Sequence, residues 1–324
     1  MKEMAMARGA KTLVETCAGI RHGENVVVVA DYSMIKIGQV IASMSYAMGA
    51  KTDLMVACPR EADGQEPTDP VAAALSNCDV FFTAVDRSLT HTHAVADALR
   101  QGARGVMLTH FTEEMLISGG LEADFVSLAP KAREVASVIR NASEIHLTTP
   151  AGTDLVMSTK GRRSNAYTCM VGPGEFSPVP NIEANVAPLE GTSEGVIVVD
   201  GSIPYEGIGL VREPITIEVA RGMLGEITGG FQAKLLREAF EQRSDPLVRN
   251  LAELGIGLNP QCKLIGVMLE DQGVWGTVHI GTGTNMTLGG SVKASCHYDL
   301  VLKKPTLTVD GRVVIDNGEI RMGG

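Results

Sequence analysis

The sequence predicts an α/β protein with two domains: an N-terminal doubly wound parallel-sheet domain and a C-terminal β-rich α+β domain. Three observations support this prediction. The chain has 324 residues, about twice the length of a typical domain. Over the first 140 residues, short apolar runs alternate with segments of helical periodicity. Beyond residue 141 the pattern changes to short strands separated by Gly, Pro and Asn.

The N-terminal domain is expected to span residues 1–142. Its predicted strands are residues 25–30, 52–57, 79–84 and 105–109, and its predicted helices are 34–48, 70–76 and 92–100. Continuous apolar strands that alternate with helices are typical of a parallel sheet covered on both faces, as in flavodoxin-like and Rossmann-like folds. No G-x-G-x-x-G follows the first strand and no Walker sequence is present, so the sequence indicates no dinucleotide cofactor.

The C-terminal domain is expected to span residues 143–324. The segment AGTD at residues 151–154 lies between two alternating runs and predicts a hairpin turn. Helical segments are expected at 231–243 and 246–254. The final stretch VDGRVVIDNGEI carries Asp-Gly and Asn-Gly pairs, which favour further hairpins.

Charge and composition argue against several classes of function. The formal net charge of −10 disfavours binding to nucleic acids and anionic lipids. No apolar run reaches the ~18–20 residues that a membrane span requires, and the N-terminus lacks the apolar core of a signal peptide. The scattered cysteines form no C-x-x-C pair, which is typical of reduced thiols in the cytoplasm. We therefore expect a cytoplasmic protein that binds neither nucleic acid nor membrane.

Five polar residues of the chain are candidate metal ligands. His297 and Asp299 form an H-x-D pair, and strand alternation places both on one face. His279 lies in an apolar strand, Glu253 lies at the end of a predicted helix among apolar residues, and Glu175 lies between glycines and prolines. Four of them have an ordinary alternative: a surface ion pair for the H-x-D residues, a hydrogen-bonded core histidine for His279 and an exposed loop acid for Glu175. Glu253, among apolar residues, needs a partner for its charge.

Taken together, three carboxylates and two imidazoles suit one or two divalent ions. Such a set binds one metal through two histidines and a carboxylate, or two metals that share a carboxylate. The residue types are compatible with Zn, Co, Mn or Fe.

The C-terminal half resembles the aminopeptidase T family of dinuclear metallopeptidases. The resemblance rests on GEFSPVP with Glu175, ELGIGLNP with Glu253, TVHIGTG with His279, and the late pair His297 and Asp299. It implies that these five residues bind metal and that Glu253 or Glu175 is the catalytic base. The family has a tyrosine seven residues after the histidine of TVHIGTG, where this chain has Met286.

Residues 145–300 are also similar to the 2,5-dihydroxypyridine 5,6-dioxygenases of nicotinate degradation. The shared stretches are AGTD, ITIEVARGMLGEITGGFQAKLLRE, GIGLNP, TGTNMTLGG and CHYD. In that family two histidines and an aspartate bind Fe(II). The H-x-D pair corresponds to His297 and Asp299, the other histidine corresponds to Glu253, and an apolar residue corresponds to His279. Both resemblances imply a C-terminal catalytic domain and assembly as a homodimer or higher homo-oligomer.

Three hypotheses follow from these resemblances. The first is a metal-dependent hydrolase that cleaves a peptide or amide bond with a metal-activated water. The second is a mononuclear Fe(II) ring-cleaving dioxygenase that uses His297, Asp299 and either His279 or Glu253. The third is a protein that kept the scaffold and binds a small ligand without converting it.

Overall fold

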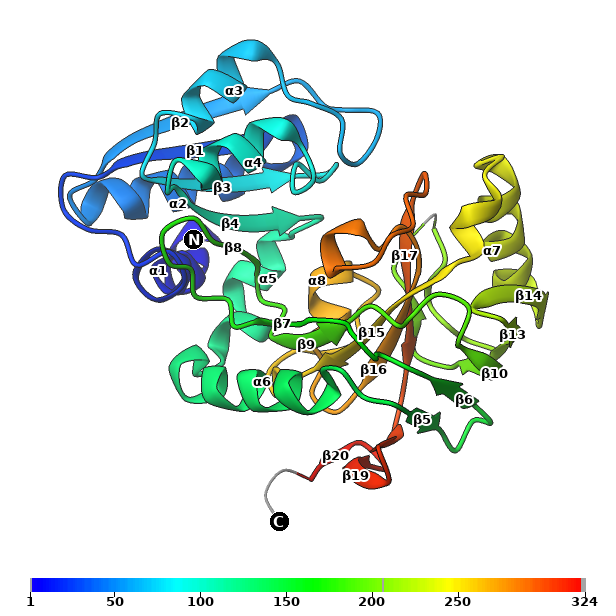
Figure 1. The fold of residues 1–324 in the computed structure, drawn as a ribbon. Coiled ribbons are helices and arrows are strands. Elements are labelled where there is room, and N and C mark those ends of the chain that lie inside the picture. Colours follow the sequence, from blue (N-terminus) through cyan, green and yellow to red (C-terminus); the bar gives the residue numbers. More distant parts are fainter. Residues whose placement is uncertain (1, 206, 322–324) are drawn as a thin grey trace. The chain divides into compact units, whose positions relative to one another are not determined.

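The computed structural model describes residues 2–205 and 207–321 and divides into two compact units (Figure 1). Unit 1 comprises residues 1–125 and 167–180, and unit 2 comprises residues 126–166 and 181–324. The sequence predicts a single boundary at 142/143. The division differs because helix α6 (Phe125–Ile139) lies almost wholly in unit 2, whereas strand β8 (Phe176–Pro178) returns to pair with strand β4 (Arg104–Thr109) of unit 1.

Unit 1 contains a five-stranded parallel sheet with the order β2-β1-β3-β4-β8. Its remaining elements are α1 (Lys2–Lys11), β1 (Asn25–Asp31), α2 (Ile35–Ala47), β2 (Lys51–Ala57), α3 (Asp69–Leu75), β3 (Val80–Val85), α4 (His93–Arg100) and α5 (Glu113–Ile117). The strands and helices predicted from the apolar periodicity are all present, within about two residues at each end.

Helices cover both faces of this sheet, as predicted. Successive side chains of β1 point to opposite faces. Val27 and Val29 belong to a core cluster with residues of α3 and α4, whereas Val28 and Ala30 lie beneath Gly38 of α2. A side-chain cap defines the start of α4: the Thr92 hydroxyl accepts a hydrogen bond from the Val95 backbone N–H.

Unit 2 is built mainly from antiparallel sheets. One eight-stranded sheet has the order β14-β13-β10-β6-β5-β18-β19-β20, and a second, five-stranded sheet has the order β17-β16-β15-β9-β7. Its elements besides α6 are β5 (Ile145–Thr148), β6 (Asp154–Met157), β7 (Ser164–Tyr167), β9 (Glu183–Val186), β10 (Glu194–Val199), β11 (Ser202–Ile203), β12 (Gly209–Leu210), β13 (Ile215–Ala220), β14 (Met223–Thr228), α7 (Phe231–Gln242), β15 (Leu251–Gly257), α8 (Met268–Asp271), β16 (Val278–Gly283), β17 (His297–Leu302), β18 (Thr306–Val309), β19 (Arg312–Asp316) and β20 (Glu319–Ile320).

The hairpins of unit 2 follow the predicted turn chemistry. AGTD lies at the turn between the antiparallel strands β5 and β6. Asp310 and Asn317 adopt positive φ angles of 46° and 49° just before their glycines, a conformation that Asp and Asn tolerate better than most residues. They turn the chain from β18 to β19 and from β19 to β20.

One predicted element is wrong. The segment 246–254 is not a helix: a short 3-10 turn at Pro246–Arg249 precedes strand β15. All seven residues of β15 are buried. The strand is also central in its sheet, where it pairs with β9 on one side and β16 on the other. A strand buried on both faces has no alternating pattern, so periodicity does not separate it from a buried helix.

Candidate metal centre

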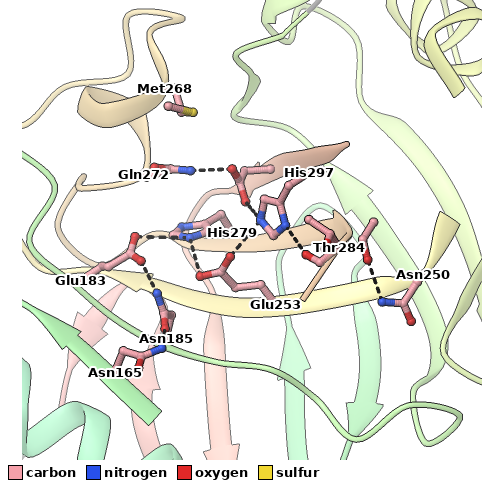
Figure 2. Close-up of polar contacts among 12 residues, drawn as sticks. Asn165, Glu183, Asn185, Asn250, Glu253, Met268, Gln272, His279, Thr284 and His297 are labelled. Carbon is pink, nitrogen blue, oxygen red and sulfur yellow. Dashed lines mark hydrogen bonds and ion pairs between the residues drawn. The ribbon is translucent and has the colours of Figure 1, made fainter. Parts of the chain in front are cut away.

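Four neighbouring strands of the five-stranded sheet in unit 2 supply a cluster of carboxylates and imidazoles (Figure 2). The cluster residues are Glu183 on β9, Glu253 on β15, His279 on β16, and His297 and Asp299 on β17. The H-x-D pair lies on one strand as predicted, and His279 lies in the predicted apolar strand.

Two glycines make room for the imidazoles on this sheet. Gly255 of β15 is paired with His279 of β16, and a Cβ atom at Gly255 would overlap the His279 ring. A Cβ at Gly281 would lie 2.6 Å from the Glu253 Cβ and 2.7 Å from the His297 Nε2. Real Cβ atoms do not approach this closely, so the pocket for the rings depends on glycine at both positions.

The five residues form two groups that share Glu253. In each group the potential ligand atoms lie within 4.8 Å of one another; the groups are Glu183, Glu253 and His279, and Glu253, His297 and Asp299. The Glu253 Oε1 lies 3.9 Å from the His279 Nε2, and its Oε2 lies 2.9 Å from the His297 Nε2. One carboxylate therefore presents one oxygen to each imidazole, which is the arrangement of a bridging ligand.

His279 is buried without a hydrogen bond. Its side chain is 1% exposed and its Nε2 lies 3.5 Å from the Glu183 Oε2, yet neither ring nitrogen has a hydrogen-bonding partner among the described residues. An unpaired buried polar group costs about 1–3 kcal/mol. His279 is therefore not the hydrogen-bonded core histidine that the sequence also allowed, and its ring nitrogens are available as potential metal ligands.

His297 is held in the tautomer that a metal ligand needs. Its Nδ1 donates a hydrogen bond to the Thr284 backbone oxygen at 2.8 Å (Figure 2), so in the neutral ring the lone pair is on Nε2. This Nε2 lies between Glu253 and Asp299. The side chain of His297 is 25% exposed, while those of Glu253 and Asp299 are 6% and 0% exposed. His297 therefore marks the side of the cluster that is open to solvent.

The charges of the cluster are strongly coupled. Burial, together with the nearby Glu253 charge, raises the pKa of Glu183 to about 7, although His279 opposes this shift. Burial alone would also raise the pKa of Asp299, but His297 holds it at about 2. Burial would lower the pKa of His297, and Asp299 and Glu253 instead raise it well above its usual value. Three buried carboxylates thus attract positive charge to this point, as a cation site must.

Amide side chains surround the terminal carboxylates. The Nδ2 groups of Asn181 and Asn185 donate to the two Glu183 oxygens. The Asn165 Nδ2 in turn donates a 2.8 Å hydrogen bond to the Asn185 Oδ1. Asp299 accepts hydrogen bonds from Gln272 and Tyr205. Such outer groups orient metal ligands and tune their affinity.

Glu183 was not a candidate in the sequence analysis. A signal for it exists in the stretch Asn181–Asn185, where an asparagine stands two residues before and two residues after the glutamate. A spacing of two is the strand period, so the three polar side chains lie on one face. Three neighbouring polar groups in an otherwise apolar, buried strand indicate a built polar site.

Glu175 lies elsewhere. It is exposed in unit 1, where its Oε2 accepts a hydrogen bond from the Gly172 backbone N–H at 2.9 Å. Neither group of candidate ligands includes it. The structure thus brings together Glu253, His279, His297 and Asp299, while Glu183 rather than Glu175 is the further glutamate beside them. The exposed Glu175 carboxylate is solvated and accepts this turn hydrogen bond, which agrees with the exposed loop acid that the sequence also allowed.

Comparisons with solved structures agree with this architecture. The chain is similar to 2,5-dihydroxypyridine dioxygenase from Pseudomonas putida KT2440, with a TM-score of 0.83 and 20% identity over 98% of this chain and 97% of that one. It is also similar to wild-type AmpT from Thermus thermophilus, with a TM-score of 0.71 and 16% identity over 99% of this chain and 100% of that one. At these identities the likeness shows a common fold, and it confirms the expected fold class.

Sequence comparisons point to one of these two families. The 2,5-dihydroxypyridine 5,6-dioxygenase of P. putida is 27% identical over 195 residues, which are 57% of this chain and 56% of that protein. The aligned part therefore spans only a little over half of the relative's length. A sequence model of the NicX family, described as 2,5-dihydroxypyridine 5,6-dioxygenase, matches residues 10–322. The chain belongs to the NicX family.

Proposed function

We propose that the protein is a metal-dependent hydrolase that cleaves a peptide or amide bond. The observation that carries this proposal is the Glu253 carboxylate, whose two oxygens face two different imidazoles. A shared carboxylate between two His/carboxylate groups suits a pair of divalent ions better than a single one. Zn, Co, Mn and Fe are all compatible with these ligands.

The residues divide the work by their positions. Glu183 and His279 form one end of the cluster, and Asp299 with the 25% exposed His297 forms the other, so solvent reaches the cluster at His297. Bound ions supply a polarised substrate carbonyl and a water of lowered pKa. Glu253 lies between the two ends, and we assign to it the role of the shared ligand rather than that of the catalytic base, because each of its two oxygens faces a different imidazole.

Metal analysis and hydrolysis assays test this proposal on the same samples. We expect about two divalent ions per chain and cleavage of peptide or amide substrates, and we expect Glu253→Ala and Asp299→Ala to lose both metal and activity. Glu175→Ala is the matched control, because its exposed carboxylate accepts a hydrogen bond within its own turn and belongs to neither group of potential ligands among the described residues, and it should keep both. Full hydrolysis by Asp299→Ala would refute the proposal.

A second candidate function is supported by the family match. The curated relative and the family model both describe a 2,5-dihydroxypyridine 5,6-dioxygenase. In this alternative the group of Glu253, His297 and Asp299 holds a single Fe(II). One iron per chain, retained in Glu183→Ala, together with oxygen uptake on 2,5-dihydroxypyridine, would favour the dioxygenase. Oxygen uptake that stays at the background rate would leave the hydrolase as the working function.

A further inference from the structure

The two oxygens of Asp299 have different surroundings. Oδ1 lies 3.2 Å from the His297 Nε2, within the group of potential ligands. Oδ2 accepts a hydrogen bond from the Tyr205 hydroxyl at 3.1 Å and another from the Gln272 Nε2. Two donors on one oxygen use the lone pairs that a metal ion would otherwise take.

The Gln272 amide is fixed in this orientation by the other end of the site. The Asn181 Nδ2 donates to the Glu183 Oε2, and the same amide nitrogen lies 3.2 Å from the Gln272 Oε1. A carboxylate only accepts, so Asn181 must present its nitrogen, and Gln272 must then present its oxygen to Asn181. This arrangement leaves the Gln272 nitrogen to donate to Asp299.

Packing likewise restrains the Tyr205 phenol. Its ring lies against Tyr298, with 4.8 Å between the ring centroids, and the Arg243 Nη2 donates to the Tyr298 hydroxyl at 2.7 Å. The Met268 sulfur lies 2.7 Å from the Tyr205 hydroxyl, but a carboxylate is the stronger acceptor for its single proton. Met286, where aminopeptidase T relatives have a tyrosine, is 53% exposed and brings no phenol. Tyr205 therefore supplies a phenol to this site from a different segment of the chain.

We propose that Tyr205 and Gln272 are positioning residues that make Asp299 a one-oxygen metal ligand. They hold Oδ2 and leave only Oδ1 for the ion. A ligand that gives one oxygen instead of two leaves a coordination position free for water or substrate. The inference rests on the proposed function only in requiring an ion at Glu253, His297 and Asp299.

Cobalt(II) is a suitable probe, because the intensity of its visible absorption falls as its coordination number rises. We would titrate the wild type, Tyr205→Phe and Gln272→Met with cobalt(II) alone and record affinity, stoichiometry and spectrum. Both variants free Oδ2 to join the ion, so we expect unchanged stoichiometry and a weaker visible band. In the hydrolysis assay kcat should fall by about tenfold or more with little change in KM, the usual size of such outer effects.

Tyr46→Phe is the matched control, because it removes an exposed phenol from α2, a helix of unit 1 that carries none of the clustered residues. It should keep the wild-type spectrum. Wild-type spectra in both Tyr205→Phe and Gln272→Met would overturn the inference. If thermal melting shows that Tyr205→Phe does not fold, Gln272→Met decides alone.

The two proposals fail in different ways. Altered cobalt spectra in the variants, together with a wild type that hydrolyses no amide, would support the positioning roles and reject the hydrolase. A wild type that binds no cobalt would reject the positioning roles as well as the metal site.

Discussion

Glu183 and His279 form the buried end of the candidate metal centre. Their side chains are 4% and 1% exposed, and the pKa of Glu183 is raised to about 7, chiefly by burial. Both residues bear a cost in the metal-free protein, since Glu183 is hard to ionise and His279 has no hydrogen bond. A cation bound between them would remove both costs.

The raised pKa of Glu183 predicts that the metal-free protein loses stability as pH rises. Between the ordinary value of 4.5 and the folded value of about 7, the folded state holds a proton that the unfolded state has released. The contribution of Glu183 to the free energy of unfolding should therefore decrease over this range, by up to about 3 kcal/mol. Urea unfolding in chelator at pH 5 and pH 7.5 measures this.

Glu183→Gln serves as the comparison for that experiment. The amide does not titrate, so the variant should lose less stability than the wild type between the two pH values. An equal loss in both proteins would show that Glu183 does not titrate in this range.

Replacing His279 separates its effect on the stability of the metal-free protein from its role in binding metal. In His279→Leu an imidazole without a hydrogen bond is replaced by an apolar side chain. We expect the free energy of unfolding in chelator at pH 5 to match or exceed that of the wild type, because Glu183, with its pKa raised to about 7 by burial, is then protonated and makes no ion pair with the imidazole. The variant should bind fewer divalent ions and gain less stability from them. Denaturant unfolding with and without metal tests both expectations. A loss of several kcal/mol in chelator would mean that His279 has a structural partner.

At the level of elements, strands β15 and β16 create the space for the site. Gly255 lies opposite His279, and Gly281 lies opposite Asp299. Their missing side chains let the imidazoles lie over the sheet. A strand glycine normally weakens a sheet. Gly255 and Gly281 therefore lower the stability of this sheet somewhat, while they leave the space that the imidazoles occupy.

Gly255→Ala should displace the His279 ring, because the new Cβ would overlap it. We expect metal affinity to fall by tenfold or more and the free energy of unfolding to fall by about 1–3 kcal/mol from overpacking. Gly225→Ala on β14 is the control, because its nearest neighbours lie 3.6 Å away, and it should retain wild-type affinity. Isothermal titration with the metal and urea unfolding measure the two effects. Wild-type metal affinity in Gly255→Ala would remove His279 from the ligand set.

At the level of the whole molecule, all five clustered residues belong to unit 2. Unit 1 carries the parallel sheet, whose sequence lacks the glycine pattern of a dinucleotide site. Within the described part of the chain, no helix combines the length and the apolar character needed to cross a bilayer.

Metal binding should therefore protect one sheet selectively. A ligand at a thousand times its Kd stabilises the state that binds it by about 4 kcal/mol. Hydrogen exchange should slow most in β9, β15, β16 and β17, the strands that bear the ligands, and least in β1, β2 and β3. Equal protection of both sheets would contradict a site confined to unit 2.

The sequence by itself determined the elements whose signals are local. The β-branched runs of unit 1, the helix periodicity, and the Asp-Gly and Asn-Gly hairpins depend on neighbouring residues, and they were predicted close to their observed limits. The H-x-D pair also followed from strand alternation alone.

Only the tertiary structure decided the composition of the site. Glu183 and Glu253 lie 70 residues apart in sequence and meet because β9 and β15 pair in one sheet. Glu175 does not join them. It accepts a hydrogen bond from Gly172 in its own turn, just before β8, which pairs with β4 in unit 1. β15 is buried on both faces, so its sequence shows no strand periodicity. Tyr205 and Gln272 both contact Asp299, although the three residues come from distant segments of the chain. Local sequence cannot encode such contacts, because they arise only when strand pairing brings remote residues to one point.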